Sequence, residues 1–270
     1  ICEKQLPSKL PRVIGIYNFI WAAGGAIAYF SGGAIAESLG WRSIYWIPAI
    51  LFCLELLVVW RIAPEWERLS KVEVPSTHKE APHPQGKLFL KMAWLANPLA
   101  YIAINAAIPL IPDLASRLGL SPRQAGFFCS IWFFSRMFTF AILAVWERWH
   151  YRFRYLILSY FGMLLCFAGM LLLSHLWLIV LVQIIFGWCL GLIYYSSLYY
   201  SMHASDTKGE HGGFHEAAIG AGIFGGPAIG AASVYLFPHV RGSGVIGVTG
   251  ALLVGMIALI AIRYRTPRTA

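Results

Sequence analysis

Eight long apolar runs are the feature that most constrains the fold of this chain. Each has about 20 mostly apolar residues, enough to cross the hydrocarbon core of a bilayer as a helix. They occupy Val13–Glu37, Ser43–Ile62, Phe89–Pro112, Pro122–Trp146, Tyr155–Ser174, Leu176–His203, His215–Phe237 and Gly244–Ile262. Lipid cannot satisfy free backbone groups, and the runs are too long and too uniform for barrel strands. The sequence therefore predicts an all-α, polytopic bundle of eight transmembrane helices.

The composition agrees with a lipid environment. The chain is 59% hydrophobic and 12% charged, whereas soluble domains usually carry about 25% charged residues. The net charge of +9 does not indicate nucleic-acid binding, because the basic residues lie between apolar runs and membrane proteins concentrate them on the cytoplasmic side. Four of the five cysteines lie inside apolar runs without a C-x-x-C pair, which favours small buried side chains over a disulfide framework.

The distribution of basic residues predicts the orientation. If the N-terminus is cytoplasmic, the inside segments hold 16 of the 21 Lys and Arg residues and the outside loops hold 4. This asymmetry follows the positive-inside rule. The remaining basic residue, Arg136, lies within an apolar run. We expect an integral membrane protein, most simply of a plasma or inner membrane.

The longest predicted loop divides the chain. Residues 63–88 combine four prolines with several charges, which is typical of a flexible cytoplasmic linker. The linker leaves two helices in residues 1–62 and six in residues 89–270. Six helices make a complete half of a common transporter architecture, and two would end the preceding half. Because the first residue is Ile1, we expect that N-terminal helices of the same protein are missing from this sequence.

Two motifs resemble the major facilitator superfamily. Residues 24–45 contain Gly32-Gly33 and then Gly40-Trp41-Arg42, similar to the fifth helix of that family and its following loop. The family often has Gly-Pro where this chain has Ala28-Tyr29, and Gly226-Pro227 occurs instead in the seventh run. Residues 146–152 resemble a degraded copy of the family's D-R-x-G-R loop.

The resemblance implies a major-facilitator-like fold in which these are helices five to twelve. It also implies a secondary active transporter that moves a small solute by alternating access, with a proton or ion as a possible coupling partner. No cofactor is implied. The G-P-x-x-G-G element, common in the family's antiporters, is lost from the first run, and this loss argues against a drug–proton antiporter.

Arg136 is the strongest candidate for a functional side chain, because a charge inside a membrane is costly and marks function by default. It could bind an anion or couple protons, or it could be a structural arginine that bonds carbonyls or extends to the interface. Other polar or aromatic side chains within the runs could line a cavity or simply hydrogen-bond between helices. These solute-binding or coupling candidates are Asn18, Trp21, Asn97, Tyr101, Asn105, Tyr195 and Glu216.

Two groups of residues are candidates for a conformational gate. In the loop after the fourth run, charged side chains could form a cytoplasmic latch, although a simple positive-inside loop explains the arginines equally well. In the seventh run, glycines permit close helix approach and a proline permits a bend. The six candidates are Glu147, Arg148, Arg152, Gly226, Pro227 and Gly230.

A metal site or an enzyme is the alternative chemistry. His211 and His215 are spaced i, i+4, with His203 and Glu216 nearby, and two His plus Glu could hold zinc. Without a further ligand we predict no metal. The sequence contains no nucleotide loop or H-E-x-x-H motif, so an intramembrane enzyme could rest only on this cluster. A sensor or scaffold that no longer transports, built on the same fold, is the other alternative.

Overall fold

The computed structural model describes residues 9–70, 83–203 and 208–265, and omits the side chains of residues 67, 69–70, 171 and 208–211. These residues form eight long helices and one short 3₁₀ helix, and none of them lies in a strand. The long helices are α1 (Leu10–Leu39), α2 (Ser43–Ser70), α3 (Gly86–Arg117), α4 (Pro122–Leu143), α5 (Phe153–Leu172), α6 (Leu176–His203), α7 (Lys208–Leu236) and α8 (Ser243–Arg265). The 3₁₀ helix η3 spans Glu147–Trp149.

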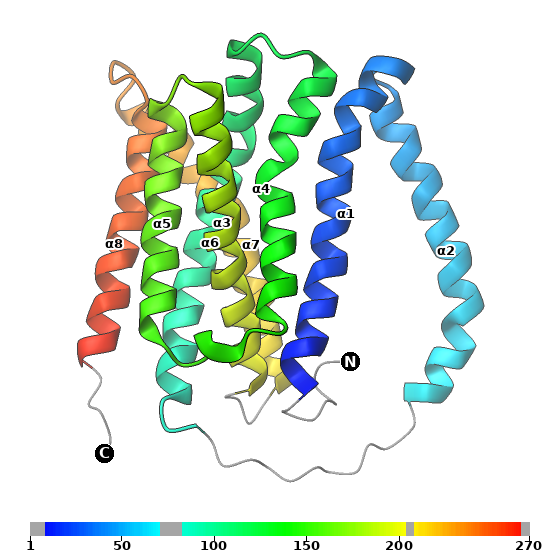
Figure 1. The fold of residues 1–270 in the computed structure, drawn as a ribbon, viewed down its shortest axis with the longest axis vertical. Helices are drawn as coiled ribbons and strands as arrows, with labels where there is room; N and C mark the ends of the chain where they lie inside the picture. Colours follow the sequence, from blue (N-terminus) through cyan, green and yellow to red (C-terminus); the bar gives the residue numbers. More distant parts are fainter. Residues whose placement is uncertain (1–8, 71–82, 204–207, 266–270) are drawn as a thin grey trace.

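The eight predicted transmembrane helices are confirmed. Each long helix contains a segment long and apolar enough to cross a membrane. The helix ends alternate between two levels, so that α1 begins, α2 ends, α3 begins and α4 ends at the same level (Figure 1). The structure therefore has the fold of a multi-pass membrane protein, with its backbone groups satisfied inside helices as lipid requires.

Two helix boundaries differ from the expected linker of residues 63–88. Helix α2 continues to Ser70 through Pro64, and α3 begins at Gly86. A proline in a helix removes one backbone hydrogen bond without always ending the helix, so the change in composition at residue 63 did not coincide with the end of α2. Residues 71–82 of that segment lie outside the described residues.

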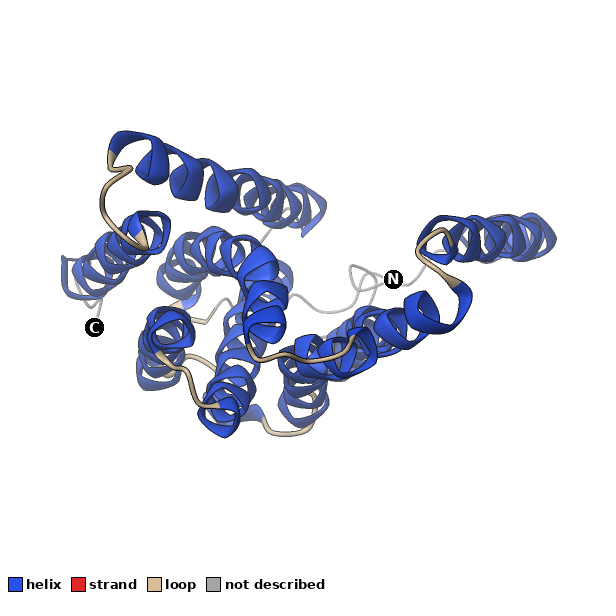
Figure 2. Cartoon of the chain, turned by 90° about the horizontal axis from the view of Figure 1, so that it is seen from above, coloured by secondary structure: helices blue, strands red, loops and turns tan. Residues whose placement is uncertain are grey.

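Helices α3 to α8 form one bundle, and α1 packs along α4 at its side (Figures 1 and 2). Inside the bundle, α3 contacts α6, α7 and α8, while α5 contacts α6 and α8. Helix α2 stands apart from the bundle and meets α1 at the loop that joins them (Figure 2). From Ile44 to Trp66, its side chains are exposed except for the half-buried Ile47.

Glycine allows α1 and α4 to approach closely. A Cβ atom on Gly33 would collide with the carbonyl group of Pro122, and one on Gly126 would lie 3.0 Å from the carbonyl oxygen of Tyr29. The end of α1 also meets the start of α4, where the Arg123 backbone N–H donates to Glu37 Oε2 across 3.0 Å. A negative charge is favourable at this position because it faces a helix N-terminus. These contacts fix the register in which α1 presents its side chains to the bundle.

Candidate functional site

The guanidinium of Arg136 lies inside the bundle, about 20 Å along α4 from Pro122 at 1.5 Å per residue. The side chain is 2% exposed. Its Nη2 donates a hydrogen bond to the Tyr101 hydroxyl of α3 across 3.2 Å, while its Nε has no hydrogen-bond partner among the described residues. Among the residues that the structure describes, Arg136 forms no ion pair. A buried cation without a neighbouring carboxylate is costly, and the site is therefore suited to an anion.

Four aromatic rings from four helices surround the guanidinium. Its Cζ lies 4.8 Å from the ring centroid of Tyr194 in α6 and 4.9 Å from that of Trp21 in α1. The rings of Phe140 and Tyr101 lie at 5.4 and 5.7 Å. Arg136 is attracted to the negative faces of such rings, which offsets part of the cost of its burial. The rings of Trp21 and Tyr194 are parallel, with centroids 5.7 Å apart.

Asn97, Tyr101 and Asn105 recur every fourth residue and share one face of α3. Only part of this face points into the bundle. Asn97 is fully buried, and Tyr101 contacts both Arg136 and the Tyr194 ring. Asn105, one turn further, is half-buried and donates through Nδ2 to the carbonyl of Tyr101 in its own helix. The structure therefore brings Asn97 and Tyr101 to the cluster, whereas the amide of Asn105 bonds its own backbone.

The other predicted binding residues are spread around this centre. Trp21 lies on the guanidinium and is 47% exposed. Asn18 is buried on α1, and neither of its amide atoms bonds to a described residue. The Tyr195 hydroxyl donates to the Pro11 carbonyl, and its ring contacts Trp149. Tyr195 therefore packs against the start of α1. Glu216 lies exposed on α7, near enough to influence the Tyr194 hydroxyl electrostatically.

Sequence reasoning missed one polar contact of the interior. His215 of α7 was considered only as a metal ligand or as part of an enzyme's cluster, yet it is fully buried, with Nδ1 2.9 Å from Ser197 Oγ and 3.5 Å from Asn97 Nδ2. Among the described residues, no three His, Cys, Asp or Glu side chains gather as metal ligands would. The side chain of His211 lies outside the description. The His–Gly-rich start of the seventh run was a visible signal, but its spacing did not reveal the partners on α3 and α6.

Aromatic side chains attach the loop between α4 and α5 to the end of α6. Glu147, Arg148 and Arg152 are exposed, and none of them forms an ion pair with a described residue. Tyr151, which has a positive φ of 53°, donates its backbone N–H to the Tyr200 hydroxyl across 2.9 Å and places its own hydroxyl 2.7 Å from His203 Nδ1. The structure thus shows an aromatic attachment of this loop to the end of α6, and the charged latch stays a prediction.

His150 strengthens this attachment. Its ring stacks on Tyr199 with the centroids 4.2 Å apart. Burial and the neighbouring His203 lower the pKa of His150 to about 4, so the ring is neutral at physiological pH. A neutral imidazole can stack on Tyr199 without bringing a charge into this half-buried position.

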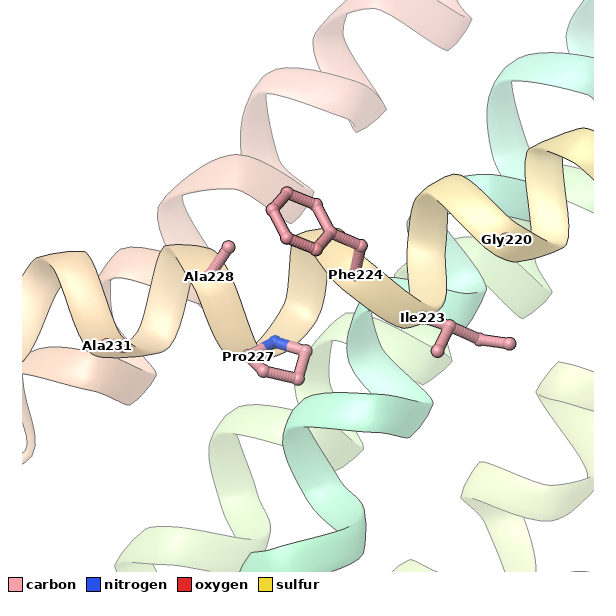
Figure 3. A pocket seen from close by; sticks show the side chains of 6 residues that line it. All are labelled: Gly220, Ile223, Phe224, Pro227, Ala228 and Ala231. Carbon is pink, nitrogen blue, oxygen red and sulfur yellow. The ribbon is translucent and has the colours of Figure 1, made fainter.

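The three gate candidates of α7, Gly226, Pro227 and Gly230, differ in what they contact. Gly226 packs on α3, where an added Cβ would lie 2.6 Å from the carbonyl oxygen of Ile102. The backbone of Gly230 faces Gly244 of α8. Pro227 lines a shallow apolar groove on α7, which shares no lining residue with the Arg136 cluster (Figure 3). The groove is lined by Gly220, Ile223, Phe224, Pro227, Ala228 and Ala231.

The fold and the buried cation define the class of the protein: an all-helical, multi-pass membrane protein with a charged centre between its helices. Residues 4–99 match the family model of the Major Facilitator Superfamily, so this part of the chain is similar to that superfamily, which supports the resemblance seen in the sequence. The match includes the Gly32-Gly33 and Gly40-Trp41-Arg42 motifs, and it implies a membrane transporter. Comparisons with curated proteins and with solved structures gave no match.

Proposed function

We propose that this protein is a secondary active transporter that moves a small solute across the membrane by alternating access, and that Arg136 binds the solute. The single observation that carries the proposal is the burial of this cation without an ion pair among the described residues. Intramembrane charges in transporters mark substrate and ion pathways. A solute anion would supply the charge that the protein does not.

The position of Arg136 supports a role in a moving site. Its ring contacts come from α1, α3, α4 and α6. Substrate sites of secondary transporters lie between helix groups that rock against each other. A solute bound at Arg136 would therefore contact both α1 and the bundle of α3 to α8. Its binding would then stabilise one arrangement of α1 relative to that bundle. Coupling to a proton or ion, residence in a plasma or inner membrane and contact with further helices of the same protein belong to this proposal.

The proposal distinguishes a transporter from a sensor or scaffold through flux. Purified protein in proteoliposomes should take up a solute in a saturable manner, and excess unlabelled solute inside should accelerate exchange of the labelled form. A panel of small organic anions, cations and neutral molecules is the appropriate probe set. Binding of a solute without any saturable flux would favour a sensor. Chemical conversion of the solute without movement would favour an enzyme.

A further inference from the structure

A second buried polar group lies beside the Arg136 cluster. His215 of α7 contacts Ser197 of α6 and Asn97 of α3, and all three side chains are buried. His215 also packs edge-to-face on the Tyr194 ring, with centroids 5.0 Å apart. The same ring lies 4.8 Å from Arg136 Cζ. Tyr194 therefore joins the two groups into one site.

Two polar side chains lie beside Nδ1 of His215. Ser197 Oγ is 2.9 Å and Asn97 Nδ2 is 3.5 Å from this nitrogen, and the donor and acceptor roles depend on the tautomer. In the tautomer that carries the ring proton on Nε2, Nδ1 accepts the Ser197 hydroxyl proton and Nε2 is a donor. His215 Nε2 has no hydrogen-bond partner among the described residues.

Three buried polar atoms near Tyr194 and Tyr101 lack hydrogen-bond partners among the described residues. They are Arg136 Nε, His215 Nε2 and Asn97 Oδ1. Arg136 contacts both rings, His215 contacts Tyr194, and Asn97 contacts His215. Buried polar groups in proteins are almost always paired, so each exception requires an explanation. Here the three exceptions belong to side chains that are linked by these contacts.

With the ring proton of His215 on Nε2, the unpartnered atoms are two donors and one acceptor. Arg136 Nε–H and His215 Nε2–H point to a ligand that accepts two hydrogen bonds and carries negative charge, which describes a carboxylate. Asn97 Oδ1 requires a ligand group that donates. Because Arg136 supplies one positive charge, a single carboxylate balances it, whereas a dianion would bring an uncompensated charge into the bundle.

We infer that Arg136, His215 and Asn97 bind a small monocarboxylate that carries a hydrogen-bond donor on the carbon next to its carboxyl group. The inference rests on the proposed function and names the substrate class of that site. The carboxylate bonds Arg136 and His215, and the adjacent donor bonds Asn97 Oδ1. A hydroxyl or an ammonium group satisfies the acceptor equally well, because either can donate a hydrogen bond to Asn97 Oδ1.

Access to this site requires movement. The three unpartnered atoms are buried, so the structure shows the site closed. Trp21 covers the guanidinium and is itself 47% exposed. A shift of α1 relative to α4 and α6 would uncover Arg136 on this side, in keeping with the alternating access proposed above.

A four-compound series tests the inference on the purified wild-type protein. Lactate has the carboxylate and a hydroxyl donor, and alanine has an ammonium donor in its place. Propionate lacks the donor, and lactamide lacks the charge. In thermal unfolding at equal ionic strength, with sodium chloride as the blank, lactate or alanine should bind at least tenfold more tightly than propionate and lactamide. Whichever of lactate and alanine binds identifies the donor.

Paired variants assign the contacts. Asn97→Leu should reduce at least fivefold the preference for the acid with the donor, lactate or alanine, over propionate. His215→Ala should weaken the binding of every carboxylate in the series. Asn105→Leu is the matched control for Asn97→Leu, because the Asn105 amide bonds its own helix. Ser196→Ala is the matched control for Ser197→Ala, because Ser196 Oγ donates to the Ile193 carbonyl. Ser197→Ala should weaken the binding of carboxylates, because His215 loses its contact with the Ser197 hydroxyl. Both control variants should bind the four compounds as the wild-type protein does.

The wild-type series keeps the test decisive even if a variant does not fold. Three results would overturn the proposed substrate class. Propionate could bind as tightly as lactate and alanine, lactamide could bind as tightly as either, or none of the four compounds could bind. Saturable uptake of a solute that is not a carboxylate, lost in Arg136→Gln, would overturn this inference while leaving the proposed transport function intact.

Discussion

Arg136 of α4 and Tyr101 of α3 meet inside the bundle, where the guanidinium Nη2 donates to the tyrosine hydroxyl across 3.2 Å. This hydrogen bond links the helix that packs on α1 to the helix that packs on α7. It also holds the guanidinium among four rings. Removing the bond should therefore affect the site more than the fold.

Tyr101→Phe should reduce saturable uptake about tenfold while leaving the bundle folded. The phenyl ring keeps its contacts, but Arg136 loses a charged hydrogen bond of about 1.5–3 kcal/mol and with it a fixed orientation. Tyr160→Phe is the matched control, because Tyr160 is also buried and its hydroxyl donates to the Leu252 carbonyl of α8 instead of bonding Arg136. Uptake, normalised to folded protein, that falls equally in both variants would show that stability and not the site is responsible.

Gly33→Ala should destabilise the protein by about 1–3 kcal/mol, as overpacking does, because the new Cβ would collide with the Pro122 carbonyl. Its neighbour provides the control. Gly32→Ala places a Cβ where nothing lies within 4 Å, and it should leave the unfolding temperature unchanged or raise it slightly. Equal unfolding temperatures for the two variants would contradict the close packing of α1 on α4.

The loop between α4 and α5 should loosen in acid. Burial and His203 lower the pKa of His150 from 6.5 to about 4, so the unfolded chain binds this proton before the folded protein does. The contribution of His150 to stability is complete above pH 6.5 and is lost as the pH falls from 6.5 towards 4.

His150→Phe retains an aromatic ring for the stack with Tyr199 but cannot titrate. Its unfolding temperature should fall less than that of wild type between pH 7 and pH 4.5. Since the other histidines remain in both proteins, the difference between the two pH profiles isolates His150. Parallel profiles would show that its protonation is not coupled to folding.

Cysteine labelling should place the two ends of the bundle on opposite sides of the membrane. In a background without the exposed Cys53, a cysteine at Arg117 should react with a membrane-impermeant reagent added to intact cells. A cysteine at Arg148 should react only after the cells are opened. Labelling of both positions from the same face would contradict the predicted topology.

The hydrophobic runs predicted the helices well because a transmembrane helix depends on length and apolar composition, which are local properties of the sequence. The helix ends were less accurate. The fourth run was predicted to end at Trp146, whereas α4 ends at Leu143 and the following residues form the loop that contains η3. Apolar Trp146 extended the predicted run, although it lies in this loop and its ring packs on Tyr155 of α5.

The site was predictable one residue at a time but not as an arrangement. The cost of an intramembrane charge identified Arg136, and the four-residue spacing of Asn97 and Tyr101 placed them on one face of α3. The rotation of α6 and α7 could not be deduced, because both helices are apolar on nearly all sides. Tyr195 was therefore selected ahead of Tyr194, which forms the ring contacts with Arg136 and His215.

Replacing Arg136 by Gln tests the central claim most directly. The measurement is saturable solute uptake in proteoliposomes, normalised to folded protein in the membrane, for Arg136→Gln, Arg136→Lys and the exposed control Arg117→Gln, whose native side chain pairs with Asp113. We predict that Gln abolishes uptake, that Lys restores it poorly because it lacks the planar guanidinium, and that Arg117→Gln transports normally. Uptake by Arg136→Gln at close to the wild-type rate would contradict the account.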